Sequence, residues 1–97
     1  MTPEQERREE QHVARGEQAR RLLEDKLFLG AVAALQADIW DQFKAADASD
    51  ALMLQRIKLR EDVLTEFFNL FRRHVETGTI ARSNLQKWRD RFTRKKR

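Results

Sequence analysis

Apolar side chains recur with a helical period in two long stretches of the chain. In residues 26–46 they fall at steps of four, three, four and four, at Phe28, Val32, Leu35, Ile39 and Phe43. Such spacing places them on one face of a helix. Residues 50–77 carry two adjacent stripes, namely Met53, Ile57, Leu64, Phe68, Phe71 and Val75, and beside them Leu52, Leu59, Val63, Phe67 and Leu70. The pattern predicts two amphipathic helices, the second with an unusually wide apolar face.

A short polar segment separates these two helices. Asp47, Ser49 and Asp50 compete with helical backbone for hydrogen bonds and can cap the helix that follows. A connection this short makes its two flanking helices antiparallel neighbours. Asp25 is a predicted N-cap for the first of them. The predicted fold is therefore all-α, an antiparallel helical hairpin of residues 26–46 against 50–77, with additional N- and C-terminal helical arms.

The two arms differ from the hairpin in their patterning. Thr2 and Pro3 suit a helix start, yet residues 4–12 contain no aliphatic side chain, so this turn frays alone or is ordered by a partner. Gly78 is the expected C-terminal stop of the second helix, and Thr79 or Ser83 is expected to cap a new one. We expect residues 1–18 to form a polar helical arm, 19–82 the hairpin core, and 83–97 an amphipathic helix with a basic tail.

Composition supports an all-α chain and excludes several classes of site. Three glycines and one proline in 97 residues are too few for the turns of a sheet. Without cysteine there is no disulfide framework and no thiolate metal site. No apolar run approaches the roughly 20 residues of a membrane span, and the N-terminus lacks the apolar segment of a signal peptide. We therefore expect an intracellular protein without a membrane partner.

The formal net charge of +4 is distributed unevenly. Residues 1–86 hold 13 basic and 15 acidic side chains, a net −2, whereas residues 87–97 hold seven basic and one acidic, a net +6. These last residues are the candidate contacts to nucleic acid or to an acidic partner: Lys87, Trp88, Arg89, Arg91, Arg94, Lys95, Lys96 and Arg97. The cations could neutralise phosphates and Trp88 could stack on a base. Trp88 also shares a helical face with Leu85 and Phe92, which favours packing onto protein.

Candidate catalytic chemistry is sparse. His12 and His74 lie far apart in the sequence, with no nucleophile or ligand at a useful spacing, and Ser49 and Ser83 occupy cap positions. Adjacent carboxylates such as Glu61 and Asp62 point in different directions on a helix. We expect no enzyme activity, no catalytic residues, no metal site and no cofactor.

The second predicted helix carries a cluster of three aromatic residues, Phe67, Phe68 and Phe71. This cluster is the strongest candidate for a protein interface. Its side chains lie on neighbouring faces of the helix, so they cannot all contact one partner helix. The alternative is that they pack in the core of the hairpin. Apolar area that stays exposed usually marks a contact surface. The predicted interface residues are Leu59, Val63, Phe67, Leu70 and Phe71.

One stretch resembles a known group of proteins. Residues 19–81 carry Leu22-Leu23-Glu24 before a Phe-bearing helix, Trp40 near the end of that helix, and Glu76-Thr77-Gly78 at the close of the next. In these features the chain resembles small helical proteins that tailed bacteriophages encode among their head and DNA-packaging genes. Lys26 departs from the pattern, since a helix-starting proline is expected there. The resemblance implies a phage assembly context and transfers no catalytic residues.

We therefore expect a phage-encoded structural or assembly protein that acts by helix-mediated contacts, in multiple copies in a virion or a head or tail complex. Its partners would be other phage structural proteins or itself, with non-specific DNA contact, first in the bacterial host cytoplasm and then in the virion. Two alternatives are a small non-specific DNA-binding protein that uses the basic tail, and a phage-made inhibitor of a host protein.

Overall fold

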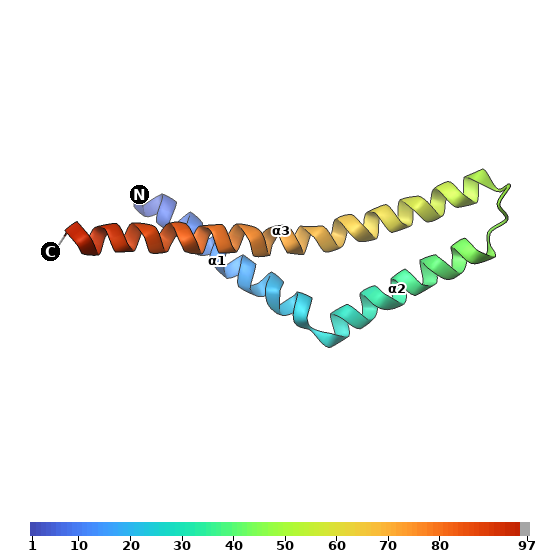
Figure 1. The fold of residues 1–97 in the computed structure, drawn as a ribbon, viewed down its shortest axis with the longest axis horizontal. Coiled ribbons are helices and arrows are strands. Elements are labelled where there is room, and N and C mark those ends of the chain that lie inside the picture. The colour runs from blue at the N-terminus through green and yellow to red at the C-terminus, as the bar shows by residue number, and fades with distance from the viewer. Residues whose placement is uncertain (96–97) are drawn as a thin grey trace. The chain divides into compact units, whose positions relative to one another are not determined.

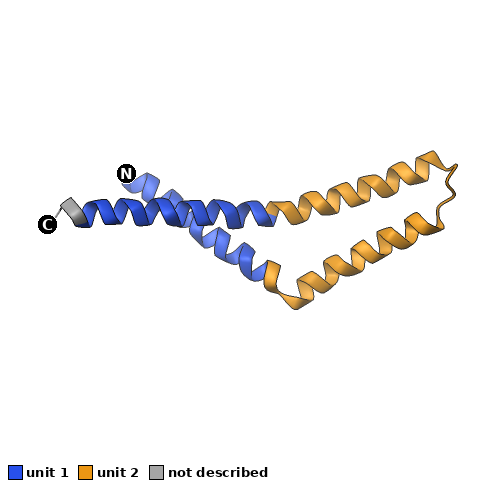
Figure 2. Ribbon diagram, in the orientation of Figure 1, with its two compact units in different colours: residues 1–22, 71–97 blue, residues 23–70 orange. Residues whose placement is uncertain are grey.

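Residues 1–95, the part of the chain that the computed structural model describes, form three helices and no strand. They are α1 (Pro3–Glu24), α2 (Lys26–Ala45) and α3 (Ala51–Lys95), shown in Figure 1. The all-α prediction is therefore confirmed. The helices group into two compact units: unit 1 is Met1–Leu22 with Phe71–Arg97, and unit 2 is Leu23–Leu70 (Figure 2).

The three helix starts are set by local caps that the sequence predicts. The Thr2 hydroxyl accepts from the Gln5 N–H at 3.2 Å, and the Gln5 side chain accepts from the Thr2 N–H at 2.8 Å, a reciprocal capping box. Asp25 accepts from the Phe28 N–H at 2.8 Å at the start of α2. Asp50 accepts from the Met53 N–H at 3.1 Å at the start of α3. Each cap satisfies a backbone donor that the first helical turn leaves free.

The predicted helix end at Gly78 is wrong. The helix α3 continues through this residue to Lys95, and no described residue has a positive φ angle. The predicted restart at Thr79 or Ser83 is wrong for the same reason, and the Thr79 hydroxyl instead donates to the Val75 carbonyl of its own helix at 3.0 Å. Gly78 makes room for a neighbouring helix rather than ending its own. The predicted domain boundaries after residues 18 and 82 consequently fall inside α1 and α3.

In unit 2, α2 and the first part of α3 contact each other at several points. The rings of Phe28 and Phe67 lie 6.4 Å apart, and Arg60 forms an ion pair with Asp38 at 3.3 Å and a hydrogen bond with Gln42. Within residues 23–70, all of which are described, only Val32, Ile39 and Ile57 are buried. This core is small for a unit of its length, so much apolar surface remains in solvent.

Candidate interaction surfaces

The first candidate surface is an apolar groove on unit 2. We call it the apolar groove. Its volume is about 440 Å³, and it is lined by Leu35, Ile39, Leu59, Arg60, Val63, Leu64 and Phe67. Leu59 and Val63 are each 63% exposed, and Phe67 is 46% exposed. Arg60 is the one charged residue of the lining, and the other lining side chains are aliphatic or aromatic. Such a surface favours another apolar helix over a polar small molecule.

The groove gathers three of the five predicted interface residues. Leu59, Val63 and Phe67 line it together, at one turn intervals along α3. Leu70 is also exposed but is not part of the lining. Phe71 is half-buried and belongs to unit 1. Sequence reasoning missed Leu35, which α2 contributes to the same lining, because its place on the helical stripe predicted a core position.

The helix α2 explains why the groove is open. Residues 27–37 contain no charged side chain, so the helix is apolar around most of its circumference. One neighbouring helix can cover only part of such a surface. Leu27, Leu29, Leu35, Trp40 and Phe43 therefore remain exposed on α2. A second groove in unit 2, of about 370 Å³, includes Trp40 and Phe43, whose rings stack at 5.5 Å.

The second candidate surface is a basic groove on unit 1. It has a volume of about 490 Å³ and is lined by Met1, Gln5, Arg8, Glu9, Asn84, Lys87, Trp88 and Arg91. The half-buried Trp88 stacks on Phe92 at 6.0 Å with a 22° interplanar angle. The structure thus brings together three of the predicted nucleic-acid contacts, and adds Arg8 from α1, which the sequence did not indicate.

The basic end of α3 is partly paired within the chain. Arg89 lies 3.8 Å from the Glu10 carboxylate, and the Asn84 amide donates to Glu9 at 3.3 Å. These contacts link the polar N-terminal turns of α1 to α3 within unit 1. The side chains of Arg94 and Lys95, and the whole of Lys96 and Arg97, lie outside the described residues, so the remaining predicted contacts have no structural account.

A third feature of unit 1 is a close crossing of α1 and α3 at Gly16 and Gly78, which we call the glycine crossing. A Cβ atom on Gly16 would lie 2.9 Å from the Gly78 Cα and 2.9 Å from the His74 carbonyl oxygen. The backbones of the two helices are therefore in direct contact, which only glycine permits. Ala19, Ala81 and Leu85 are buried apolar residues of the same unit.

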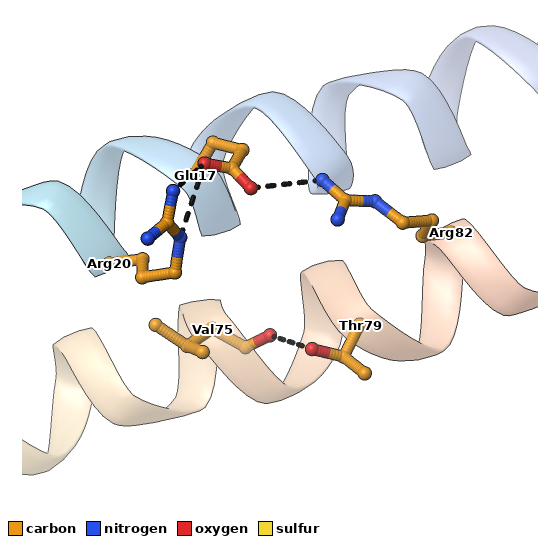
Figure 3. Close-up of polar contacts among 5 residues, drawn as sticks. All are labelled: Glu17, Arg20, Val75, Thr79 and Arg82. Carbon is orange, nitrogen blue, oxygen red and sulfur yellow. Dashed lines mark hydrogen bonds and ion pairs between the residues drawn. The ribbon is translucent and has the colours of Figure 1, made fainter.

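A carboxylate links both helices beside the glycine crossing. Glu17 binds Arg20 of its own helix at 2.8 Å and Arg82 of α3 at 3.0 Å (Figure 3). Its hydrogen bonds from Arg20, and then those from Arg82, lower the pKa of Glu17 from 4.5 to about 2. The carboxylate therefore stays ionised at all physiological pH values. Glu17 therefore forms a charged link between α1 and α3 within unit 1.

Neither a metal-binding cluster nor a membrane-spanning helix is found within residues 1–95. The described residues contain no group of three or more histidine, aspartate or glutamate side chains arranged to hold a metal ion. None of the three described helices combines the length and apolarity that crossing a membrane requires.

Comparisons with protein families, curated proteins and solved structures give no match to this chain.

Proposed function

We propose that this chain is a phage-encoded structural or assembly protein that acts by helix-mediated protein contacts, in multiple copies in a larger complex. The observation that supports the proposal most directly is the apolar groove of unit 2. Three exposed side chains of α3 and one of α2 meet there with little polar lining. The phage context rests on the resemblance of residues 19–81 to small phage proteins.

In this proposal, α2 and the first part of α3 act as an antiparallel hairpin with helical arms at both ends. A helix from a partner subunit would fill the apolar groove against Leu35, Leu59 and Val63. Burial of apolar area contributes about 25 cal/mol per Å², so covering these side chains would stabilise both the complex and the small core of unit 2. The same contact repeated by each copy would build an assembly.

The test compares a double substitution in the apolar groove with a single control substitution, both made in the phage that encodes the chain. Leu59→Ala and Val63→Ala together truncate the groove. Ile80→Ala truncates an equally exposed side chain of unit 1 outside it. We expect mass spectrometry to find the wild-type chain and the Ile80→Ala variant in purified particles or assembly intermediates, and the groove variant to be strongly depleted. Absence of the wild-type chain from both fractions would contradict the proposal.

A second candidate function is non-specific nucleic-acid binding, which the basic groove favours. Arg8, Lys87 and Arg91 line the same groove as Trp88, so cations and an aromatic ring occur together. If Lys87 and Arg91 each contact a phosphate, replacing both by alanine lowers the salt slope of log K by about 1.8. Replacement of Lys58 and Arg56, basic residues of unit 2, serves as the control. An unchanged slope in the groove variant would exclude this function.

A further inference from the structure

The two helices of the glycine crossing carry the same short motif. Residues 12–20 read HVARGEQAR and residues 74–82 read HVETGTIAR, so histidine, valine, glycine, alanine and arginine recur at identical spacing, 62 residues apart. Leucine follows three residues later in both, at Leu23 and Leu85. The chain thus presents one contact surface twice, once on α1 and once on α3.

The contact between the two motifs is reciprocal. A Cβ on Gly16 would lie 2.9 Å from the Gly78 Cα and the His74 oxygen, and a Cβ on Gly78 would lie 2.9 Å from the Gly16 Cα and the His12 oxygen. His12 and His74 are themselves matching positions of the motif. The crossing therefore has a local two-fold relationship between its helices, the arrangement that two identical subunits make in an isologous dimer.

The charges beside the motif decide which helices pair. Glu10 binds Arg89 at 3.8 Å, and the position in α3 that matches Glu10 is Arg72. If two copies paired α3 with α3 in the same register, Arg89 would meet Arg72 of the other copy. Glu17, which binds Arg82, is likewise matched by the uncharged Thr79. The flanking charges thus select α1 against α3, whether both belong to one chain or to two.

A single residue joins α1 to the next helix. Asp25 stands between Glu24, the last residue of α1, and Lys26, the first of α2, with φ −72° and ψ 124°. Rotation of ψ at this residue into the helical region would make one continuous helix of residues 3–45. Short connections of this kind allow an element to leave its own chain and pair with a second copy.

From these four observations we propose that the glycine crossing also forms between two copies of the chain, by reciprocal exchange of α1. In the exchanged dimer the motif of each α1 packs on the α3 motif of the other copy. The glycine contact and the Glu17–Arg82 pair are re-formed twice, while Asp25 becomes helical. This inference does not depend on the proposed function, because it uses unit 1 and the junction rather than the apolar groove.

Charge exchange tests the proposal with two variants, Glu17→Arg and Arg82→Glu. Either variant alone places like charges at the crossing, in cis or in an exchanged homodimer. A mixed dimer restores both opposite-charge pairs, so we expect native mass spectrometry of the mixture to show heterodimer at roughly fivefold or more over either homodimer. The double variant E17R/R82E, which restores the pair within one chain, should behave as wild type.

The junction and a matched control complete the experiment. Lys26→Pro keeps the start of α2 but holds Asp25 out of the helical region, so adding it to both chains should abolish the heterodimer. Mixing Lys58→Asp with Asp62→Lys, which exchange charge in an ion pair within α3, should give no enrichment. A mixture of E17R and R82E without heterodimer overturns the proposal. A heterodimer that K26P leaves unchanged overturns the role of the junction.

Discussion

Each of the three helices contains one glycine in its interior. Replacing these glycines by alanine is expected to have opposite effects on stability at different positions. Gly16 and Gly78 touch each other through their backbones, whereas a Cβ on Gly30 would meet nothing within 4 Å. The intrinsic helix preference favours alanine over glycine by about 1 kcal/mol at every one of these positions. The sign of a Gly→Ala change is therefore decided by the neighbouring helix rather than by the residue's own conformation.

We predict that Gly78→Ala destabilises unit 1 and Gly30→Ala stabilises the chain. In Gly78→Ala the new methyl group meets the Gly16 Cα and the His12 oxygen, and overpacking of this kind costs about 1–3 kcal/mol. In Gly30→Ala the gain is about 1 kcal/mol, or roughly 4–8 °C in Tm for a chain of this size. Urea unfolding measures both, and a stabilised Gly78→Ala would disprove the close crossing.

The ion pairs of Glu17 predict an acid-sensitive contribution to stability. The folded-state pKa of about 2 lies below the ordinary 4.5, so the contribution is fully present above pH 4.5 and is lost as the pH falls toward 2. Glu17→Gln should therefore lower the stability at pH 7 slightly and flatten its decline between those values. Carbon-detected NMR titration of the Glu17 carboxyl gives the direct test. A midpoint near 4.5 would contradict the two arginine contacts.

At the scale of elements, the packing of α2 on α3 depends on few side chains. Ile57 is 4% exposed, whereas Leu59, two residues along the same helix, is 63% exposed. We expect Ile57→Ala to lower the free energy of unfolding by about 2–3 kcal/mol, near the lower end for such truncations because the surrounding core is thin. Leu59→Ala should change it by less than about 0.5 kcal/mol. Equal effects on thermal unfolding would contradict the burial pattern.

Some parts of each helix could be predicted from the sequence and others could not. Thr2 and Asp25 were correctly predicted as caps, and Asp50 is the one of three candidates, with Asp47 and Ser49, that caps α3. These predictions were possible because capping uses backbone groups within three residues. Gly78 was predicted wrongly, because its role is set by Gly16, a residue far away in the sequence. Local rules read an isolated glycine after Arg72, Arg73 and His74 as a helix end.

The pairing of α1 with the last part of α3 was also missed. The first turns of α1 have no apolar stripe, so periodicity carried no signal for their neighbour. The repeated HV, G and AR pattern at residues 12–20 and 74–82 was present in the sequence and could have indicated it. For the candidate surfaces, α3 residues were identified by their stripes, whereas Leu35 and Arg8 depend on which helices meet.

At the scale of the whole molecule, charge separates the two candidate functions. Removal of residues 87–97 changes the formal net charge from +4 to −2. Non-specific DNA binding through the basic groove should then fall sharply in mobility-shift assays, because Lys87, Trp88 and Arg91 are removed and Arg8 alone remains of the cations that line it. Protein contacts through the apolar groove should persist, since the groove lies in unit 2. Retained DNA binding by the truncated chain would place the nucleic-acid contacts elsewhere.

The two tryptophans fall one to each unit, Trp40 in unit 2 and Trp88 in unit 1, and the sequence contains no tyrosine. Replacing each tryptophan in turn by phenylalanine therefore gives two variants, and the intrinsic fluorescence of each variant reports on one unit only. A chain that keeps only Trp40 reports burial of the second groove of unit 2 as a shift of its emission toward the blue. A chain that keeps only Trp88 reports the basic groove through quenching by stacked bases. Without any added dye, the colour and intensity of the emitted light would show which unit a newly found partner occupies.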